Sequence, residues 1–290
     1  MSVVILGSTG MLGDAVAKEF DNFAGEVHLT ARSNSSGFNS SEPPYIQFDA
    51  QKDSLESSLG FLGTGDFIIN CIGIIKTEID ESDPASCERA RVINSEFPAR
   101  LVRFAEARGI RVIQIATDCV FSGSDGHYTE SSRHDPVDLY GETKSAGEVF
   151  SENIMHLRVS IIGREKRGFT SLFEWVARQE RGAVITGYVN HFWNGIPAKH
   201  FGKIARAVIE HDLFEAGVHH VLPAEQVSKA QLVRLIAAHA CRGDLQIVDG
   251  NATKAIDRTL ATNDPEFNAS LWAAAGCATV PSVAQLVAEI

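Results

Sequence analysis

The stretch Gly7-Ser-Thr-Gly-Met-Leu-Gly13 follows a short apolar run, Val3 to Leu6, and opens a helical pattern that extends to Phe20. Glycines three residues apart let the backbone turn tightly, approach a pyrophosphate and pack the helix against the strand. The helix N-terminus then presents unpaired N–H groups to the phosphates. This context predicts a dinucleotide site, the alternative being a tight turn with a small-residue packing spot. The predicted contacts are Gly7, Thr9, Gly10, Met11, Leu12 and Gly13.

Short apolar runs alternate with helical patterns through the first half of the chain. The runs are apolar on both faces, as in strands buried within a parallel sheet. The expected strands are 3–6, 27–30, 45–48, 67–71, 112–115 and 155–159. The expected helices are 11–20, 54–59, 87–108 and 140–150. This alternation predicts an α/β fold with a doubly wound, Rossmann-like parallel sheet.

The pattern loosens after residue 160, where we expect a smaller α/β lobe that binds substrate at the ligand-binding edge of the sheet. The predicted domains are 1–160 for the cofactor and 161–290 for the substrate, with 189–213 packing back on the first. Helical patterns cover 169–179, 199–210, 228–240 and 282–290, and short strands are expected at 183–187, 219–222 and 245–248. The Ser-, Asn- and Pro-rich stretch 33–44 is expected to be a surface loop.

Composition excludes several classes of protein. The 290 residues include 26 basic and 37 acidic side chains, a formal net charge of −11, with no basic run for a nucleic acid or an anionic membrane. The five cysteines are far apart, which is typical of reduced thiols, and the scattered histidines predict no metal site. The N-terminus lacks the pattern of a signal peptide, and the longest apolar stretch is about half a membrane span. We therefore expect a cytoplasmic protein without a membrane partner.

Residues at the ends of the second and third strands bear on the cofactor. An acidic residue after the second strand would accept a hydrogen bond from the ribose of NAD, whereas arginine fits the 2′-phosphate of NADP. Arg32 and Ser33 therefore favour NADPH, with NADH the weaker choice and a solvated loop arginine the alternative interpretation. Asp49, followed by Ala50, is placed to receive the adenine amino group or to cap a helix. The residues expected along the nicotinamide are Cys71, Ile72 and Gly73.

A tyrosine and a lysine four residues apart, Tyr140 and Lys144, share one face of a predicted helix. A free phenol has a pKa of about 10, and a nearby ammonium would lower it and make Tyr140 a usable acid or base. Thr117 follows the fifth strand at the edge where such sheets bind ligands. It can therefore hydrogen-bond the substrate oxygen with which Tyr140 would exchange a proton. We therefore predict Thr117, Tyr140 and Lys144 as catalytic, the alternatives being an exposed helix pair and a turn contact. Asn94 is expected to hold the active-site backbone or a water.

Three further stretches carry a family resemblance: Ala116-Thr-Asp-Cys-Val-Phe-Ser-Gly123, Gly126-His-Tyr-Thr-Glu130 with Pro136, and Tyr140-Gly-Glu-Thr-Lys-Ser-Ala-Gly-Glu148. Together with the glycine loop they resemble extended short-chain dehydrogenases/reductases and, more narrowly, the dTDP-4-dehydrorhamnose reductase family. The resemblance implies NADPH-dependent reduction of the 4-keto group of a nucleotide-linked deoxysugar, in nucleotide-sugar and cell-surface polysaccharide biosynthesis. It also implies that Lys144 holds the nicotinamide ribose, and it is compatible with a homodimer.

Two segments depart from the family pattern and bear on the identity of the sugar. Ala116 and Cys119 stand where the family usually has serine and tyrosine, and the substrate-side segment reads Asn190-His-Phe-Trp-Asn-Gly-Ile-Pro-Ala198. Arg258 could bind a diphosphate, with a surface salt bridge as the alternative. The predicted substrate contacts are Thr117, Asp118, Cys119, Trp193, Asn194 and Arg258.

Two other functions fit the same motifs. One is a nucleotide-sugar epimerase or 4,6-dehydratase with tightly held NAD, against which stand Arg32 and the lack of an acid/base pair after Thr117. The other is a non-catalytic NADP-binding subunit that regulates a partner enzyme. The intact Thr117, Tyr140 and Lys144 argue against that alternative.

Overall fold

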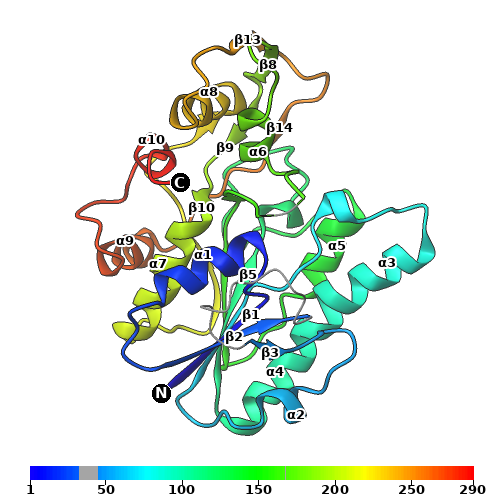
Figure 1. Cartoon of the computed structure of the whole chain (residues 1–290), viewed down its shortest axis with the longest axis vertical. Helices are drawn as coiled ribbons and strands as arrows, with labels where there is room; N and C mark the ends of the chain where they lie inside the picture. The colour runs from blue at the N-terminus through cyan, green and yellow to red at the C-terminus, as the bar shows by residue number, and fades with distance from the viewer. Residues whose placement is uncertain (33–44, 167) are drawn as a thin grey trace.

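The computed structural model describes residues 1–32, 45–166 and 168–290. Its central sheet consists of seven parallel strands, with the bounds β1 Ser2–Leu6, β2 Glu26–Ala31, β3 Ile46–Gln47, β4 Phe67–Asn70, β5 Arg111–Ala116, β6 Ile154–Arg158 and β11 Gly217–His220. Their order is β11-β6-β5-β4-β1-β2-β3 (Figure 1). The strand order reverses between β1 and β4, which is where a doubly wound sheet binds its ligand. The predicted Rossmann-like fold is confirmed.

Two layers of helices cover the sheet, and strand side chains alternate between them. Val3 and Ile5 of β1 face one layer, and Val4 and Leu6 face the other. The first layer contains α1 Met11–Glu19, α7 Ala198–Glu210 and α9 Pro265–Ala274. The second contains α2 Leu55–Leu59 and α4 Phe97–Arg108. Figure 1 shows α1 and α7 on one side of the strands and α4 on the other.

The helix predicted at 87–108 is a continuous run of three pieces, α3 Pro84–Arg91, the π-helical turn η2 Val92–Glu96, and α4. It begins three residues early because Asp83 caps it and proline is favoured in the first turn. It ends as predicted at Gly109, which adopts the left-handed conformation. The next helix, α5 Leu139–Ala146, is shorter than predicted and ends at Gly147.

The smaller lobe has its own core, in which Phe173, Leu232 and Ile236 are buried. Its helices are α6 Leu172–Ala177, α8 Lys229–His239 and α10 Val283–Val287. Its short strands are β8 Val184–Tyr188, β9 His191–Trp193, β12 Val227–Ser228, β13 Gln246–Gly250 and β14 Ile256–Asp257. Two further strands, β7 Ile161–Ile162 and β10 Ile196–Pro197, pair with each other. The remaining short helices are η1 Lys76–Glu78 and η3 Asp118–Val120.

One strand belongs to the central sheet and not, as predicted, to the smaller lobe. The run expected at 219–222 in the smaller lobe is β11, which pairs with β6 and completes the central sheet. This pairing covers the edge of β6 and makes β11 the edge strand of the sheet. Helix α7, within the segment expected to pack back, lies against α1. The division of the chain at residue 160 therefore stays a prediction about folding units, because later elements join the first layers.

Three further observations concern the described part of the chain. No helix there is both long and apolar enough to cross a bilayer. No three His, Cys, Asp or Glu side chains there are grouped so as to hold a metal ion. All five cysteines are free thiols.

Candidate active site

A cavity of about 590 Å³ lies at the carboxyl ends of β1, β2, β4 and β5. Most of the predicted site residues line it, namely Gly7, Thr9, Gly10, Met11, Leu12, Arg32, Asp49, Ala50, Cys71, Ile72, Gly73, Thr117, Asp118, Cys119, Tyr140 and Lys144. Gly13, Trp193, Asn194 and Arg258 do not line it. Ser33 lies outside the described residues. Residues from across the first half of the chain therefore meet at one edge of the sheet.

The glycine loop has the geometry that a dinucleotide requires. Gly7 has φ of +75°, and its N–H donates to the Thr30 hydroxyl at 3.0 Å. A Cβ on Gly13 would lie 2.2 Å from the Gly7 carbonyl oxygen, so α1 can approach the loop only at a glycine. No side chain caps α1 at Gly10, so the N–H groups of its first turn remain available for an anion in the cavity. These residues fit a bound pyrophosphate.

Two residues mark the adenine end of the cavity. Arg32 is exposed at the end of β2. The Asp49 carboxylate accepts a hydrogen bond from Gln51 N at 3.0 Å, so it caps a local turn. The N-cap of α2 is instead Ser54, whose hydroxyl accepts from Ser57 N. Asp49 therefore lines the cavity without capping α2.

The predicted catalytic residues converge on the cavity from β5 and α5. The Thr117 hydroxyl accepts from Cys119 N and donates to the Asp118 carboxylate, both at 3.2 Å. Tyr140, in the first turn of α5, lines the same cavity as Thr117. One turn later, the Lys144 ammonium donates to the Ile115 carbonyl at 3.1 Å. A hydroxyl, a phenol and an ammonium thus meet beside the last residues of β5.

The pKa of the Tyr140 phenol is shifted in the direction opposite to the prediction. Burial raises this pKa, and negative charge at Cys119 adds to the rise, while the contact with Thr117 opposes it. Burial also lowers the pKa of Lys144, against the opposing charge of Glu148. The prediction of a lowered Tyr140 pKa is therefore wrong for this structure, because desolvation of the phenol outweighs the influences that lower the pKa. Tyr140 is held protonated, as a proton donor must be.

Asn94, in the π-helical turn, ties two walls of the cavity together and is 2% exposed. Its Oδ1 accepts from Ile74 N at 2.9 Å, and its Nδ2 donates to Ile74 O at 3.0 Å. The same Nδ2 donates to the Thr143 hydroxyl of α5 at 3.1 Å. Asn94 thus holds active-site backbone, the first of its two expected roles.

Two residues predicted to contact substrate instead hold the protein together. Trp193 is 4% exposed, and its indole N–H donates to the Ser160 hydroxyl at 2.9 Å. The Asn194 side chain bonds both to Leu260 O at 2.7 Å and to Leu260 N at 3.0 Å. Trp193 belongs to the core of the smaller lobe, and β9 is paired on both sides by the later strands β12 and β14. Only Ser160, beneath the indole, lines the cavity.

Two cations of the smaller lobe lie behind Asp118. The Arg258 Nε donates to Phe121 O at 2.8 Å, and this arginine forms no ion pair with any described residue, so the surface salt bridge is not formed. The Lys229 ammonium lies 5.6 Å from the centre of the Trp193 ring. Burial raises the pKa of Asp118, and the charges of Arg258 and Lys229 oppose this rise. The smaller lobe therefore places two cations close to Asp118, next to the Thr117 hydroxyl.

Several cavity residues were missed by sequence reasoning. The polar ones on the cavity wall include Arg89, Ser160, Glu165 and Lys166, and Lys229 lies behind Asp118. Lys166 forms an ion pair with Asp14 of α1 at 2.6 Å. The only local signal was the capping box around Ser228, which marks the start of α8 at Lys229 but not what the helix end faces.

Comparisons with known proteins agree with this geometry. A family model described as RmlD substrate binding domain matches residues 1–265. Methionine adenosyltransferase 2 subunit beta of Rattus norvegicus is 27% identical over 247 residues, covering 81% of this chain and 71% of that protein. A dTDP-4-dehydrorhamnose reductase of Mycolicibacterium smegmatis is 31% identical over 148 residues, covering 50% of this chain and 40% of that protein. The crystal structure of dTDP-4-dehydrorhamnose reductase from Bacillus anthracis in complex with NADP matches with a TM-score of 0.76 at 17% identity, covering 99% of this chain and 97% of that one.

Proposed function

Because the chain belongs to the RmlD substrate binding domain family, within the extended short-chain dehydrogenases/reductases, we propose that it is an NADPH-dependent reductase of a nucleotide-linked deoxysugar. The group reduced is the 4-keto group. The observation that carries this proposal is the meeting of Thr117, Tyr140 and Lys144 at the switch point of the sheet. The partial match to a dTDP-4-dehydrorhamnose reductase supports the choice of substrate class.

The cofactor would lie across the ends of β1 and β4. The glycine loop and the first turn of α1 would hold its pyrophosphate, and Asp49 would face its adenine. Arg32 would pair with the 2′-phosphate, which favours NADPH over NADH. A complex of the Bacillus anthracis reductase with NADP supports a nicotinamide dinucleotide as the cofactor. When bound, the dihydronicotinamide supplies a hydride to the carbonyl carbon.

The protein's own residues would manage the charge on the carbonyl oxygen. Tyr140 would donate its proton to that oxygen, and its raised pKa keeps the proton in place until the oxygen becomes basic. Thr117 would hydrogen-bond the same oxygen. Lys144 would exchange its bond with Ile115 O for the nicotinamide ribose. Lys229 and Arg258, which lie behind Asp118 and do not line the cavity, would offset the two charges of the nucleotide-sugar diphosphate from there.

The test is to mix the protein with NADPH and a panel of nucleotide-linked 4-keto-6-deoxy sugars and to follow nicotinamide absorbance. Oxidation is expected with one sugar, and Tyr140→Phe should keep NADPH binding and lose turnover by about a hundredfold or more. The matched control is Tyr188→Phe, because Tyr188 is exposed on β8 of the smaller lobe. Full activity in Tyr140→Phe would remove Tyr140 from the mechanism.

A second candidate is a non-catalytic NADP-binding subunit of another enzyme. It is favoured by similarity to a methionine adenosyltransferase subunit over 81% of the chain. NADPH binding without oxidation in the presence of any sugar, together with a stable complex with a methionine adenosyltransferase on gel filtration, would support this candidate. An epimerase or dehydratase would instead copurify with NAD that never turns over.

A further inference from the structure

A buried guanidinium lies one strand away from the proposed active site. Arg158, the last residue of β6, is 1% exposed. In the sheet register its neighbours are Ala116, which precedes Thr117, and His220, the last residue of β11. Isolated charge is costly in such a place, so the partners of the guanidinium decide what it does.

All the guanidinium nitrogens have partners. Nη1 lies 2.8 Å from His220 Nε2, and Nη2 lies 2.8 Å from His134 Nε2. The Glu148 carboxylate pairs with Nη2 and accepts from Nε at 3.2 Å. Arg158 is thus the centre of a network that contains one carboxylate and two imidazoles.

The geometry fixes the protons on both histidines. A guanidinium can only donate hydrogen bonds, so Nε2 of His134 and Nε2 of His220 must accept them. Each ring is therefore neutral, with its proton on Nδ1. His220 Nδ1 then donates to Ala261 O at 2.6 Å, and His134 Nδ1 donates to the Ser145 hydroxyl at 2.8 Å. The four hydrogen bonds of the two rings agree with this single assignment.

Electrostatics support the neutral forms. Burial and the Arg158 charge lower the pKa of His220 to about 4, against the opposing charges of Glu130 and Glu148. Burial likewise lowers the pKa of His134, with Arg158 acting in the same direction and Glu148 and Asp135 opposing. At neutral pH both rings can therefore accept from Arg158.

One side of the network holds the helix that carries the proposed catalytic pair. Ser145 lies on α5, one residue after Lys144, and Glu148 follows the end of this helix. Glu148 N also donates to Ser145 O at 3.2 Å. The contacts of Arg158 with Glu148 and His134 therefore fix the end of α5.

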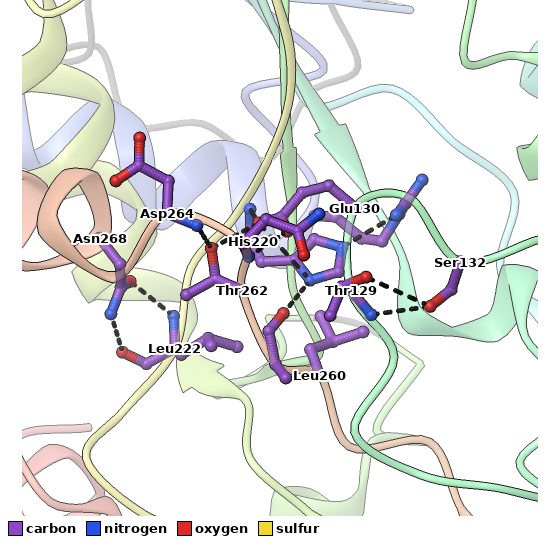
Figure 2. Close-up of polar contacts among 12 residues, drawn as sticks. Thr129, Glu130, Ser132, His220, Leu222, Leu260, Thr262, Asp264 and Asn268 are labelled. Carbon is purple, nitrogen blue, oxygen red and sulfur yellow. Dashed lines mark hydrogen bonds and ion pairs between the residues drawn. The ribbon is translucent and has the colours of Figure 1, made fainter.

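The other side holds the segment 257–263, which includes Arg258 and whose Ala261 carbonyl accepts from His220. His220 N donates to the Glu130 carboxylate at 3.1 Å. The same carboxylate accepts from the Thr262 hydroxyl at 2.7 Å and from Asn263 N at 2.8 Å. Figure 2 shows His220, Glu130 and Thr262 gathered in this way.

We propose that Arg158 is a positioning residue that couples the seating of segment 257–263 to the placement of α5. Arg258, which would offset the charge of the substrate diphosphate, and Tyr140, which would donate the proton, are then set together. The effect on catalysis rests on the proposed function. The coupling itself does not, because it is a property of the folded chain.

The assignment of protons is tested by long-range ¹H–¹⁵N NMR of the imidazoles at pH 7. We expect the His134 and His220 rings, identified by His134→Gln and His220→Gln, to carry their protons on Nδ1. A charged ring, or a proton on Nε2 of either ring, would overturn the network.

The coupling is tested by amide hydrogen exchange in Thr262→Val, a mild change at the far side of the network. Exchange should rise in 139–146 as well as in 259–263, by about tenfold, the effect of losing a hydrogen bond to a charged group. The control is Thr64→Val, whose hydroxyl bonds to Arg108 O away from the network. A rise confined to 259–263 would refute the coupling.

Kinetics separate this inference from the proposed function. If the protein reduces a nucleotide-sugar, Thr262→Val should lower kcat and leave the KM for NADPH unchanged. An unchanged kcat, or a KM for NADPH that rises by the same factor as kcat falls, would contradict a positioning role. If no sugar is reduced, the proposed function fails while the exchange experiment still decides the coupling.

Discussion

Replacing Asn94 with alanine would remove the side chain that joins the segment after β4 to α5. The variant loses three hydrogen bonds, two to Ile74 backbone atoms and one to the Thr143 hydroxyl. Ile74 is 5% exposed, so water cannot easily replace the lost partners. The backbone N–H and the carbonyl oxygen of Ile74 would both lose these partners.

The magnitude follows from these contacts. A buried donor or acceptor left without a partner costs about 1–3 kcal/mol, so the two Ile74 groups together predict a loss of about 2–6 kcal/mol. This is a large share of the roughly 5–15 kcal/mol that stabilises a typical protein. Because Thr143 belongs to the same network, Asn94→Ala and Thr143→Ala should be less than additive.

The assay is urea unfolding followed by tryptophan fluorescence and by circular dichroism. The matched control is Asn251→Ala, since Asn251 is exposed and forms no side-chain hydrogen bond with described residues. The control should stay within about 0.5 kcal/mol of the unmodified protein. A loss below about 1 kcal/mol in Asn94→Ala would show that the Ile74 backbone finds other partners, and the reasoning would fail.

Three further changes have defined outcomes. Gly13→Ala, whose new Cβ would lie 2.2 Å from Gly7 O, should abolish NADPH binding in a fluorescence titration, while Gly243→Ala, with open space around it, should bind normally. Lys229→Met should weaken dTDP binding in calorimetry by about tenfold, the effect of losing one nearby positive charge, and unchanged affinity would move the diphosphate elsewhere. Burial lowers the pKa of His200 from 6.5 to about 4, so its contribution to stability is complete above pH 6.5 and is lost as the pH falls toward 4. His200→Gln should lack this loss of about 3 kcal/mol between urea unfolding at pH 7 and at pH 4, and an identical pH dependence would contradict the assignment.

The sequence predicted what depends on local pattern. Apolar runs and the glycine loop determine the sheet and its ligand edge, because strand, turn and helix are contiguous in the chain. Thr117, Tyr140 and Lys144 were found for a related reason: each stands at the end of a predicted strand or on one helix face.

What the sequence did not predict depends on contacts between distant segments. A short run such as Gly217–His220 does not reveal which sheet edge it will join. The spacing of Tyr140 and Lys144 predicts that they are neighbours, but not how deeply the phenol is buried, and burial decides its pKa. The sequence marks Lys229 as the start of a helix, but it does not reveal that the Lys229 ammonium lies near Asp118.

The position of β11 has a consequence for how the chain is made. A ribosome releases β1 to β6 long before it releases His220, so the outer edge of β6 stays open while the smaller lobe is being synthesised. Open strand edges attract other strands, which makes this interval the period when the nascent chain is most prone to aggregation. A truncation before Gly217 would make that state permanent. The smaller lobe therefore cannot be deleted as a block, because the strand that covers the edge of β6 lies within the same stretch of the sequence.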